Sequence, residues 1–235
     1  MPKELSKRYR KALELVDAKK PYPLTSAVEV LSKFPKAKFN ETVEVAFKLG
    51  VDAKQSDQMV RGTVPLPHGS GKTVKVLVFA RNGAAADNAR AAGAEYVGYE
   101  DLIKKCIEGW TDFDVAIATP EAMIEVRKLG KVLGPRGLMP NPKTGTVTED
   151  TARAVKEVKA GRVEFKIDKA GNVHVPVGKV SFKPQQLAEN ARAVIEAVSK
   201  AKPASAKGTF IQSCTLSATM SPPVRVDIRE FTAAA

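Results

Sequence analysis

The sequence predicts an α/β protein of two domains, with one domain inserted into the other. The segment PLPHGSGK (65–72) combines prolines with glycines and is typical of a linker. After it, the predicted strands change from alternating to continuously apolar patterns. Patterns like those of the first segment return after Gly161. We therefore expect residues 1–67 and 160–235 to form a discontinuous α+β domain, and residues 68–159 a small three-layer α/β domain with a parallel sheet. Because the ends of an insertion must lie close together, two parallel linkers would join the domains and permit a hinge.

The first terminal segment is expected to hold two helices and two strands. An apolar spacing across residues 5–16 is typical of an amphipathic helix. Ser26 and Glu29 have capping-box spacing, which predicts that a second helix begins there. Residues 41–49 alternate between apolar and polar side chains, which predicts a half-buried strand, and residues 58–64 fit another. The polar face of the first strand carries Thr42, Glu44, Ala46 and Lys48.

The inserted domain alternates strands with helices, an order that implies parallel pairing in a layered sheet. The nearly continuous apolar run VKVLVFA (74–80) is typical of a strand covered on both faces. Residues 130–146 contain four glycines and three prolines, so we expect a structured loop there without helix or strand. The other expected elements are helices at 83–93, 100–109, 120–129 and 150–159 and strands at 96–97 and 113–118.

The second terminal segment returns to mixed helices and strands. Strands are expected at 163–167 and 173–177, and an antiparallel pair at 208–218 and 224–228. Between the two pairs, Pro184 opens a helix. One face of that helix carries Leu187, Ala191, Val194, Ile195 and Val198. Such an apolar stripe is typical of a helix that packs on a core.

Charge follows this division. The chain carries a formal net charge of +12 and has a pI of about 9.7. Residues 1–67 hold 13 basic and 8 acidic side chains and residues 160–235 hold 11 and 6, so the discontinuous domain carries +10 and the insert +2. A strongly basic body points to a polyanion, foremost a nucleic acid. The alternative is an ordinary basic protein that binds nothing acidic.

Motifs for other function classes are missing. HGSGKT (68–73) fails as a phosphate-binding loop, because Leu66 stands where the first glycine is needed and a strand follows. With no dinucleotide fingerprint or catalytic motif, we expect no enzyme activity, no cofactor and no small-molecule substrate. Cys106 and Cys214 form no CxxC pair, so they are expected in the core of a protein from a reducing cytoplasm. Isolated histidines predict no metal site, and no apolar run or secretory signal suggests a membrane.

Two stretches combine side chains that suit RNA. KFNETVEV (38–45) supplies the charge of Lys38 and the flat ring of Phe39, and SCTLSATMSP (213–222) supplies the adaptable Met220. Their small hydroxyls are those of Thr42, Ser213, Ser217, Thr219 and Ser221. Structured RNA is recognised largely by shape, through 2′-hydroxyls, phosphates and stacking. The alternative is that Phe39 and Met220 belong to the core.

The Gly- and Pro-rich loop of the insert is a second candidate. Between Glu125 and Glu149 the chain has no acidic residue. It has the cations Arg127, Lys128, Lys131, Arg136 and Lys143. Cations beside exposed glycine backbone make a suitable phosphate surface. The alternative is a solvated basic loop that holds the inserted domain together.

Four stretches together point to one family. They are KFNETVEV at 38–45, KVLGPRGLMPNPKTGTV at 131–147, HVPVGKVSF at 174–182 and SATMSPPVRV at 217–226. In these stretches, in their order and in its insertion plan, the chain resembles the bacterial ribosomal protein L-one family, the proteins of the mobile stalk of the large subunit. The resemblance covers essentially the whole chain. It implies a cytoplasmic, ribosome-associated protein whose split terminal domain binds large-subunit rRNA.

Carried over position by position, the resemblance implies a main RNA surface in the terminal domain. That surface comprises Lys38, Phe39, Thr42, Glu44, Ser213, Thr219, Met220 and Ser221. A weaker RNA contact would come from Lys131, Arg136 and Lys143 in the insert. The family usually has glycine where this chain has Ser221. The added Cβ would alter a close backbone approach unless the hydroxyl compensates.

The resemblance also implies two further roles. One is release of deacylated tRNA at the exit site, and the other is repression of the protein's own operon mRNA, whose leader would imitate the rRNA site. The expected partners are therefore large-subunit rRNA, exit-site tRNA, the mRNA and the large subunit. A free-standing RNA-binding translational regulator is the first alternative. The second is a nucleotide-dependent enzyme that uses the inserted domain, against which Leu66 argues.

Overall fold

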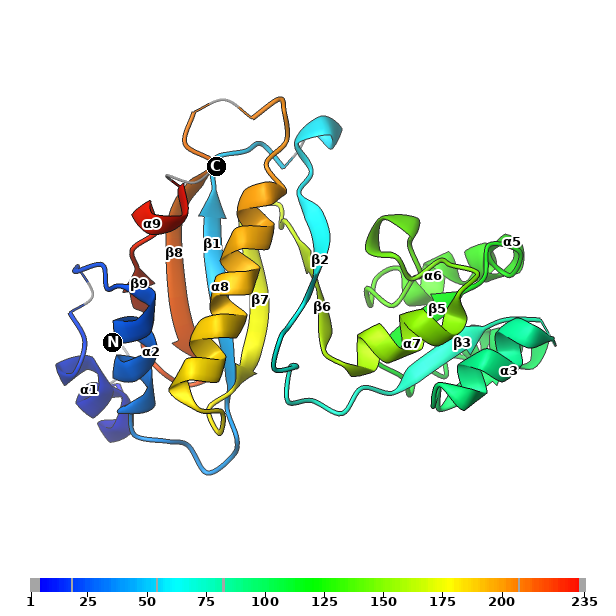
Figure 1. Ribbon diagram of the computed structural model, residues 1–235, viewed down its shortest axis with the longest axis horizontal. Coiled ribbons are helices and arrows are strands. Elements are labelled where there is room, and N and C mark those ends of the chain that lie inside the picture. Colours follow the sequence, from blue (N-terminus) through cyan, green and yellow to red (C-terminus); the bar gives the residue numbers. More distant parts are fainter. Residues whose placement is uncertain (1–4, 18, 54, 82, 207, 233–235) are drawn as a thin grey trace. The chain divides into compact units, whose positions relative to one another are not determined.

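The structure is a computed structural model that describes residues 5–17, 19–53, 55–81, 83–206 and 208–232 (Figure 1). Its helices and strands form a mixed α/β fold that includes a parallel sheet, which confirms the predicted fold class. The chain forms two compact units. The terminal unit combines Met1–Gly71 with Val163–Ala235, and the inserted unit is Lys72–Arg162.

The terminal unit contains two sheets, and its four-stranded sheet is antiparallel. The strands are β1 (Thr42–Leu49), β2 (Arg61–Pro65), β6 (Arg162–Lys166), β7 (Asn172–Lys179), β8 (Ile211–Ala218) and β9 (Val224–Val226). The helices are α1 (Lys7–Glu14), α2 (Leu24–Ser32), the 3-10 turn η1 (Ser56–Gln58), α8 (Pro184–Lys200) and α9 (Arg229–Thr232). The main sheet has the order β7-β1-β8-β9, and β2 pairs with β6 in a second sheet.

The alternation along β1 divides its side chains between two faces of the sheet. The apolar set is at most 2% exposed and consists of Val43, Val45, Phe47 and Leu49. Helices α2 and α8 cover this face, and the predicted apolar stripe of α8 is buried in the same core (Figure 1). The opposite face, here called the open face, carries the half-buried Thr42 and Glu44 and the exposed Lys48. A period of two thus separates the core from a polar surface.

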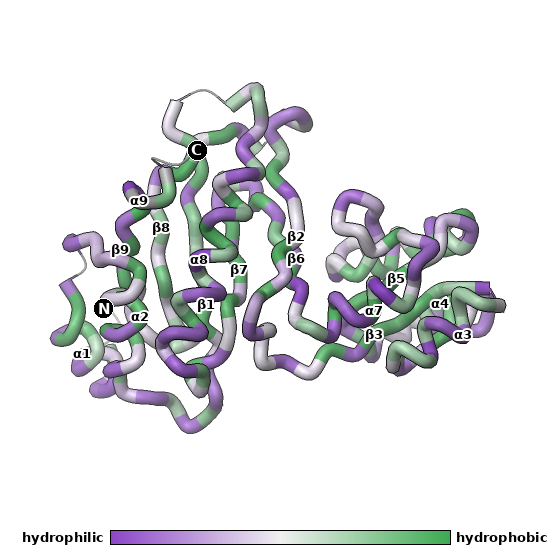
Figure 2. Tube along the Cα trace, in the orientation of Figure 1, coloured by the Kyte–Doolittle hydropathy of each residue, from purple (hydrophilic) through white to green (hydrophobic). Residues whose placement is uncertain are grey.

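The inserted unit has three layers around a parallel sheet of order β4-β3-β5. Its strands are β3 (Val76–Phe79), β4 (Tyr96–Gly98) and β5 (Val115–Ala118). Its helices and 3-10 turns are α3 (Ala84–Ala91), α4 (Glu100–Ile107), α5 (Met123–Val126), η2 (Arg127–Leu129), α6 (Gly130–Leu133), η3 (Pro142–Thr144) and α7 (Thr151–Lys159). Strand β3 is an uninterrupted hydrophobic stretch (Figure 2). Leu77 and Phe79 pack with α4 and α5, while Val76 and Val78 pack with α3 and α7, so β3 is covered on both faces as predicted.

The Gly- and Pro-rich segment differs from its expectation. It contains the helical turns α6 and η3, where the sequence predicts neither helix nor strand. A single turn tolerates such residues when packing supports it. Here Leu133 is fully buried, and the Gly134 amide donates to the Gly130 carbonyl (3.0 Å) at a spot where a Cβ on Gly134 would clash. The helix expected at 120–129 is likewise divided into α5 and η2.

Two boundaries in the terminal unit also differ. Helix α2 begins at Leu24, so the capping box expected from Ser26 and Glu29 is wrong. Pro23 has an extended backbone and is the N-cap residue of α2. Burial of Leu24 in the core favours this earlier start. The strand expected from residue 58 begins at Arg61, because the turn η1 precedes it.

Candidate nucleic-acid interface

The two stretches predicted to bind RNA meet at one end of the terminal sheet. Strands β1 and β8 pair antiparallel, so the start of one lies beside the end of the other (Figure 1). The Thr219 amide donates to the Thr42 carbonyl (3.0 Å), and the Thr42 amide donates to the Thr219 hydroxyl (3.1 Å). Residues 177 positions apart are thereby joined. We call this region, residues 38–42 with 219–221, the β1–β8 edge.

Two large apolar side chains are exposed at the β1–β8 edge. Phe39 is 53% exposed and Met220 is 52% exposed, so neither belongs to the core. Lys38 is exposed too, and within the described residues no acidic group pairs with it. Asn40 fixes the loop, since its side chain donates to the Ser181 hydroxyl (3.0 Å) and accepts from the Ser181 amide (3.3 Å). A ring, a thioether and a cation gathered in this way can stack on bases and neutralise phosphate.

The hydroxyls at this edge are engaged within the protein. Besides accepting from the Thr42 amide, the Thr219 hydroxyl donates to the Thr42 carbonyl (3.3 Å). The Ser221 hydroxyl accepts from the Ala218 amide (2.9 Å) and closes a turn in which the Ser221 amide donates to the Ala218 carbonyl (3.0 Å). Ser221 has a negative φ, so its backbone does not require glycine. Thr219 and Ser221 therefore hold the edge together through their hydroxyls.

Glu44 and Ser213 lie on the open face, away from the edge. Glu44 is opposite Ser217 on β8, and Ser213 is opposite Lys48 near the far end of β1. Six residues of strand separate Ser213 from Thr219, which is about 20 Å. The structure thus brings Lys38, Phe39, Thr42, Thr219, Met220 and Ser221 together, and extends Glu44 and Ser213 along a strip of the sheet.

The residues of this strip lie within a segment that matches a known protein family. A family model described as the Ribosomal protein L1p/L10e family matches residues 31–222. The chain belongs to this family. The match contains the β1–β8 edge and the whole inserted unit. Membership in the L1 family implies a structural role in the ribosome, with binding to rRNA and to the large subunit.

Sequence reasoning missed Lys179, a cation beside the β1–β8 edge. Lys179 lies opposite Thr42 at the end of β7, and its ammonium donates to the Thr42 hydroxyl (2.7 Å). This bond places a positive charge beside the β1–β8 edge. The only signal in the sequence was the position of Lys179 within the stretch HVPVGKVSF. A single lysine at the end of a strand forms no local pattern that would indicate a binding site.

The predicted secondary cations all lie in the inserted unit. Lys131 is on α6, Arg136 follows it and Lys143 is on η3, and all three are exposed. The Arg136 guanidinium donates to the Thr111 hydroxyl. Asn141 fixes the turn by accepting from the Lys143 amide (2.8 Å). The loop is therefore a defined basic surface of the inserted unit.

Other features of the L1-family chain lie outside this candidate interface. HGSGKT leads into β3 and not into a helix, so a phosphate-binding loop is not formed. Cys106 and Cys214 are buried as predicted, and burial raises the pKa of the Cys214 thiol to about 12. None of the described helices is long and apolar enough to cross a membrane. In the described part of the chain, no cluster of three His, Cys, Asp or Glu could hold a metal ion.

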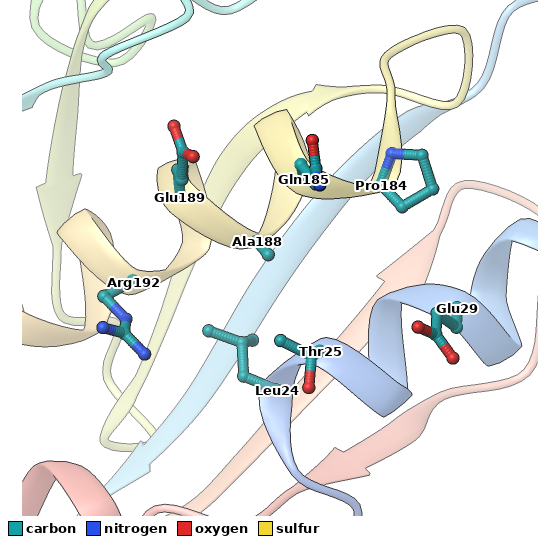
Figure 3. Close-up of a pocket in the computed structure, with 8 residues that line it drawn as sticks. All are labelled: Leu24, Thr25, Glu29, Pro184, Gln185, Ala188, Glu189 and Arg192. Carbon is teal, nitrogen blue, oxygen red and sulfur yellow. The ribbon is translucent and has the colours of Figure 1, made fainter.

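A groove of about 390 Å³ lies between α2 and α8 (Figure 3). Leu24 and Ala188 contribute apolar walls, and Glu29, Glu189 and Arg192 contribute charges. Because α2 and α8 cover the face of the sheet opposite the open face, this groove is separate from the strip that contains Glu44 and Ser213.

Proposed function

We propose that this L1-family protein binds large-subunit rRNA through the β1–β8 edge and the adjoining open face. Phe39 and Met220 stack on or pack against nucleotides, Lys38 neutralises phosphate, and Thr42, Glu44 and Ser213 contact riboses or bases along the strip. Thr219 and Ser221 keep the edge in shape. The observation that carries this proposal is the joining of two distant stretches, each with an exposed apolar side chain, at one end of a basic unit.

The physical argument is that RNA binding needs both a shape and a charge. A-form RNA and its loops are recognised through 2′-hydroxyls, phosphates and unstacked bases. Exposed Phe39 and Met220 supply adaptable apolar surface, and Lys38 with Lys179 supplies positive charge beside it. The net +10 of the two terminal segments strengthens the approach of a polyanion.

We further propose that the bound protein belongs to the mobile stalk at the tRNA exit site, where it assists release of deacylated tRNA. Lys131, Arg136 and Lys143 of the inserted unit supply a weaker RNA contact in this role. The family resemblance supports this proposal, as it supports repression of the operon mRNA by the free protein in the cytoplasm. One surface then serves two RNAs, so rRNA and the mRNA leader must compete.

Footprinting on large-subunit rRNA tests the main proposal. Wild-type protein is expected to protect one compact rRNA site, and Phe39→Ala protein is expected to lose protection there at the same concentration. Unchanged protection by Phe39→Ala protein would contradict the proposed interface. Sedimentation separates the alternative of a free-standing regulator, which would not travel with large subunits.

A further inference from the structure

Glu41 is a buried carboxylate at the β1–β8 edge. It is 3% exposed, and a buried charge is stable only when paired and hydrogen-bonded. Its Oε1 accepts from the Ala37 amide (2.8 Å) and from Arg8 Nη1 (3.3 Å). Its Oε2 accepts from the Met220 amide (3.0 Å). One carboxylate therefore holds the loop before β1 and the turn after β8.

Arg8 of helix α1 completes the same arrangement from a third part of the chain. Its Nη2 donates to the Met220 carbonyl (3.0 Å), and its Nη1 donates to the Pro35 carbonyl (3.4 Å). Both main-chain polar groups of Met220 are thus bonded to the Arg8–Glu41 pair. Figure 1 shows α1, the loop that enters β1 and the end of β8 at the same end of the terminal unit.

The exposed side chains of the edge need such an anchor. The side chains of Phe39 and Met220 are about half exposed, so core packing alone does not fix their backbone. Disordered loops would have to be ordered on binding, at a cost in affinity. We propose that Arg8 and Glu41 are a positioning pair that holds the 35–39 loop and the Met220 turn in their RNA-binding arrangement. This inference rests on the proposed function and adds residues that do not themselves recognise RNA.

The chemistry at Glu41 explains why a carboxylate is needed. Its three partners are all donors, and an ionised carboxylate accepts at both oxygens. Glu41→Gln has nearly the same shape but turns an NH₂ group toward one of these donors. Arg8→Lys keeps the charge but loses the planar fork that reaches two carbonyls. Each change therefore loosens the β1–β8 edge but leaves the side chains that are proposed to contact RNA in place.

The test measures rRNA affinity, its salt dependence and amide exchange in full-length protein. Glu41→Gln is expected to lower the affinity of the folded protein about ten- to a hundredfold, and Arg8→Lys should act in the same direction. The log–log salt slope should stay at its wild-type value, because no cation is removed. In RNA-free protein, the Ala37 and Met220 amides should exchange faster while those of central β1 stay protected. The matched control is the ion pair Arg61–Glu164 of β2 and β6, where Arg61→Lys and Glu164→Gln should leave all readouts unchanged.

Phe39→Ala in the same assay separates the two proposals. One outcome is that Phe39→Ala weakens binding while Glu41→Gln and Arg8→Lys bind within about twofold of wild type. That result refutes the positioning pair and leaves the proposed rRNA interface supported. If Phe39→Ala binds normally, both proposals fall. Arg8→Ala removes the cation, so a salt slope that falls by about one contact in this variant would make Arg8 a direct phosphate ligand and overturn the positioning role. Denaturant melts give the folded fraction, and Arg8→Lys tests the pair if Glu41→Gln does not fold.

Discussion

Truncation of Met220 separates a binding role from a structural one. A fully buried methionine loses about 2–5 kcal/mol of unfolding free energy when it is cut to alanine. Met220 is 52% exposed, and its main-chain bonds to Glu41 and Arg8 do not depend on its side chain. Exposed sites change stability by about 0.5 kcal/mol, so for this half-exposed side chain we expect Met220→Ala to cost less than about 1 kcal/mol.

The RNA affinity of the same variant should fall by about tenfold, equivalent to ~1.4 kcal/mol. Denaturant melts and rRNA titrations on one preparation measure both quantities. Met59 is a matched control, because it is a methionine of the terminal unit that is 50% exposed and lies outside the proposed strip. Met59→Ala should leave affinity unchanged. A loss of 2 kcal/mol or more in Met220→Ala, with normal affinity in the folded fraction, would refute the reasoning and place Met220 in the core.

Three further predictions address charge, hydroxyls and domains. Lys38→Ala should flatten the log–log salt slope of rRNA binding by about one contact, and a slope equal to wild type would exclude Lys38 as a phosphate partner. Thr219→Val should weaken binding at an unchanged slope and also cost about 1 kcal/mol of unfolding free energy, because its hydroxyl bonds Thr42; unchanged melts would contradict that role. A chain joining residues 1–67 to 160–235 through a short Gly linker should fold and bind the rRNA site, whereas isolated 68–159 should bind weakly, and equal affinity of the insert and the whole protein would refute the site assignment.

Periodic patterns in the sequence were sufficient for the fold class. The alternation at Val43, Val45 and Phe47 specifies which face of β1 is buried, because a strand repeats every two residues. The continuous apolar run of β3 likewise specifies a strand covered on both faces. The helical turns near Leu133 and Gly134 could not be predicted, because packing decides single turns and composition opposes them.

The candidate site was predictable only where the chemistry of neighbouring residues in the sequence revealed it. Local chemistry identified Phe39 and Met220, and the structure shows both exposed. It could not reveal that the Thr219 hydroxyl is used inside the protein, since its partner Thr42 lies 177 residues away. Nor could any local pattern connect Arg8 with Glu41, because only the folded chain brings α1 to the end of β8.

Site-specific photo-crosslinking tests the central claim most directly. A photoreactive phenylalanine analogue at position 39 places the probe on the β1–β8 edge, with the same probe at Met59 and at the exposed Ile124 of the inserted unit as controls. In complexes with large-subunit rRNA, we expect an efficient crosslink from position 39 and little from 59 or 124. Crosslinks from position 124 with none from position 39 would contradict the proposal that the terminal unit binds rRNA through this edge.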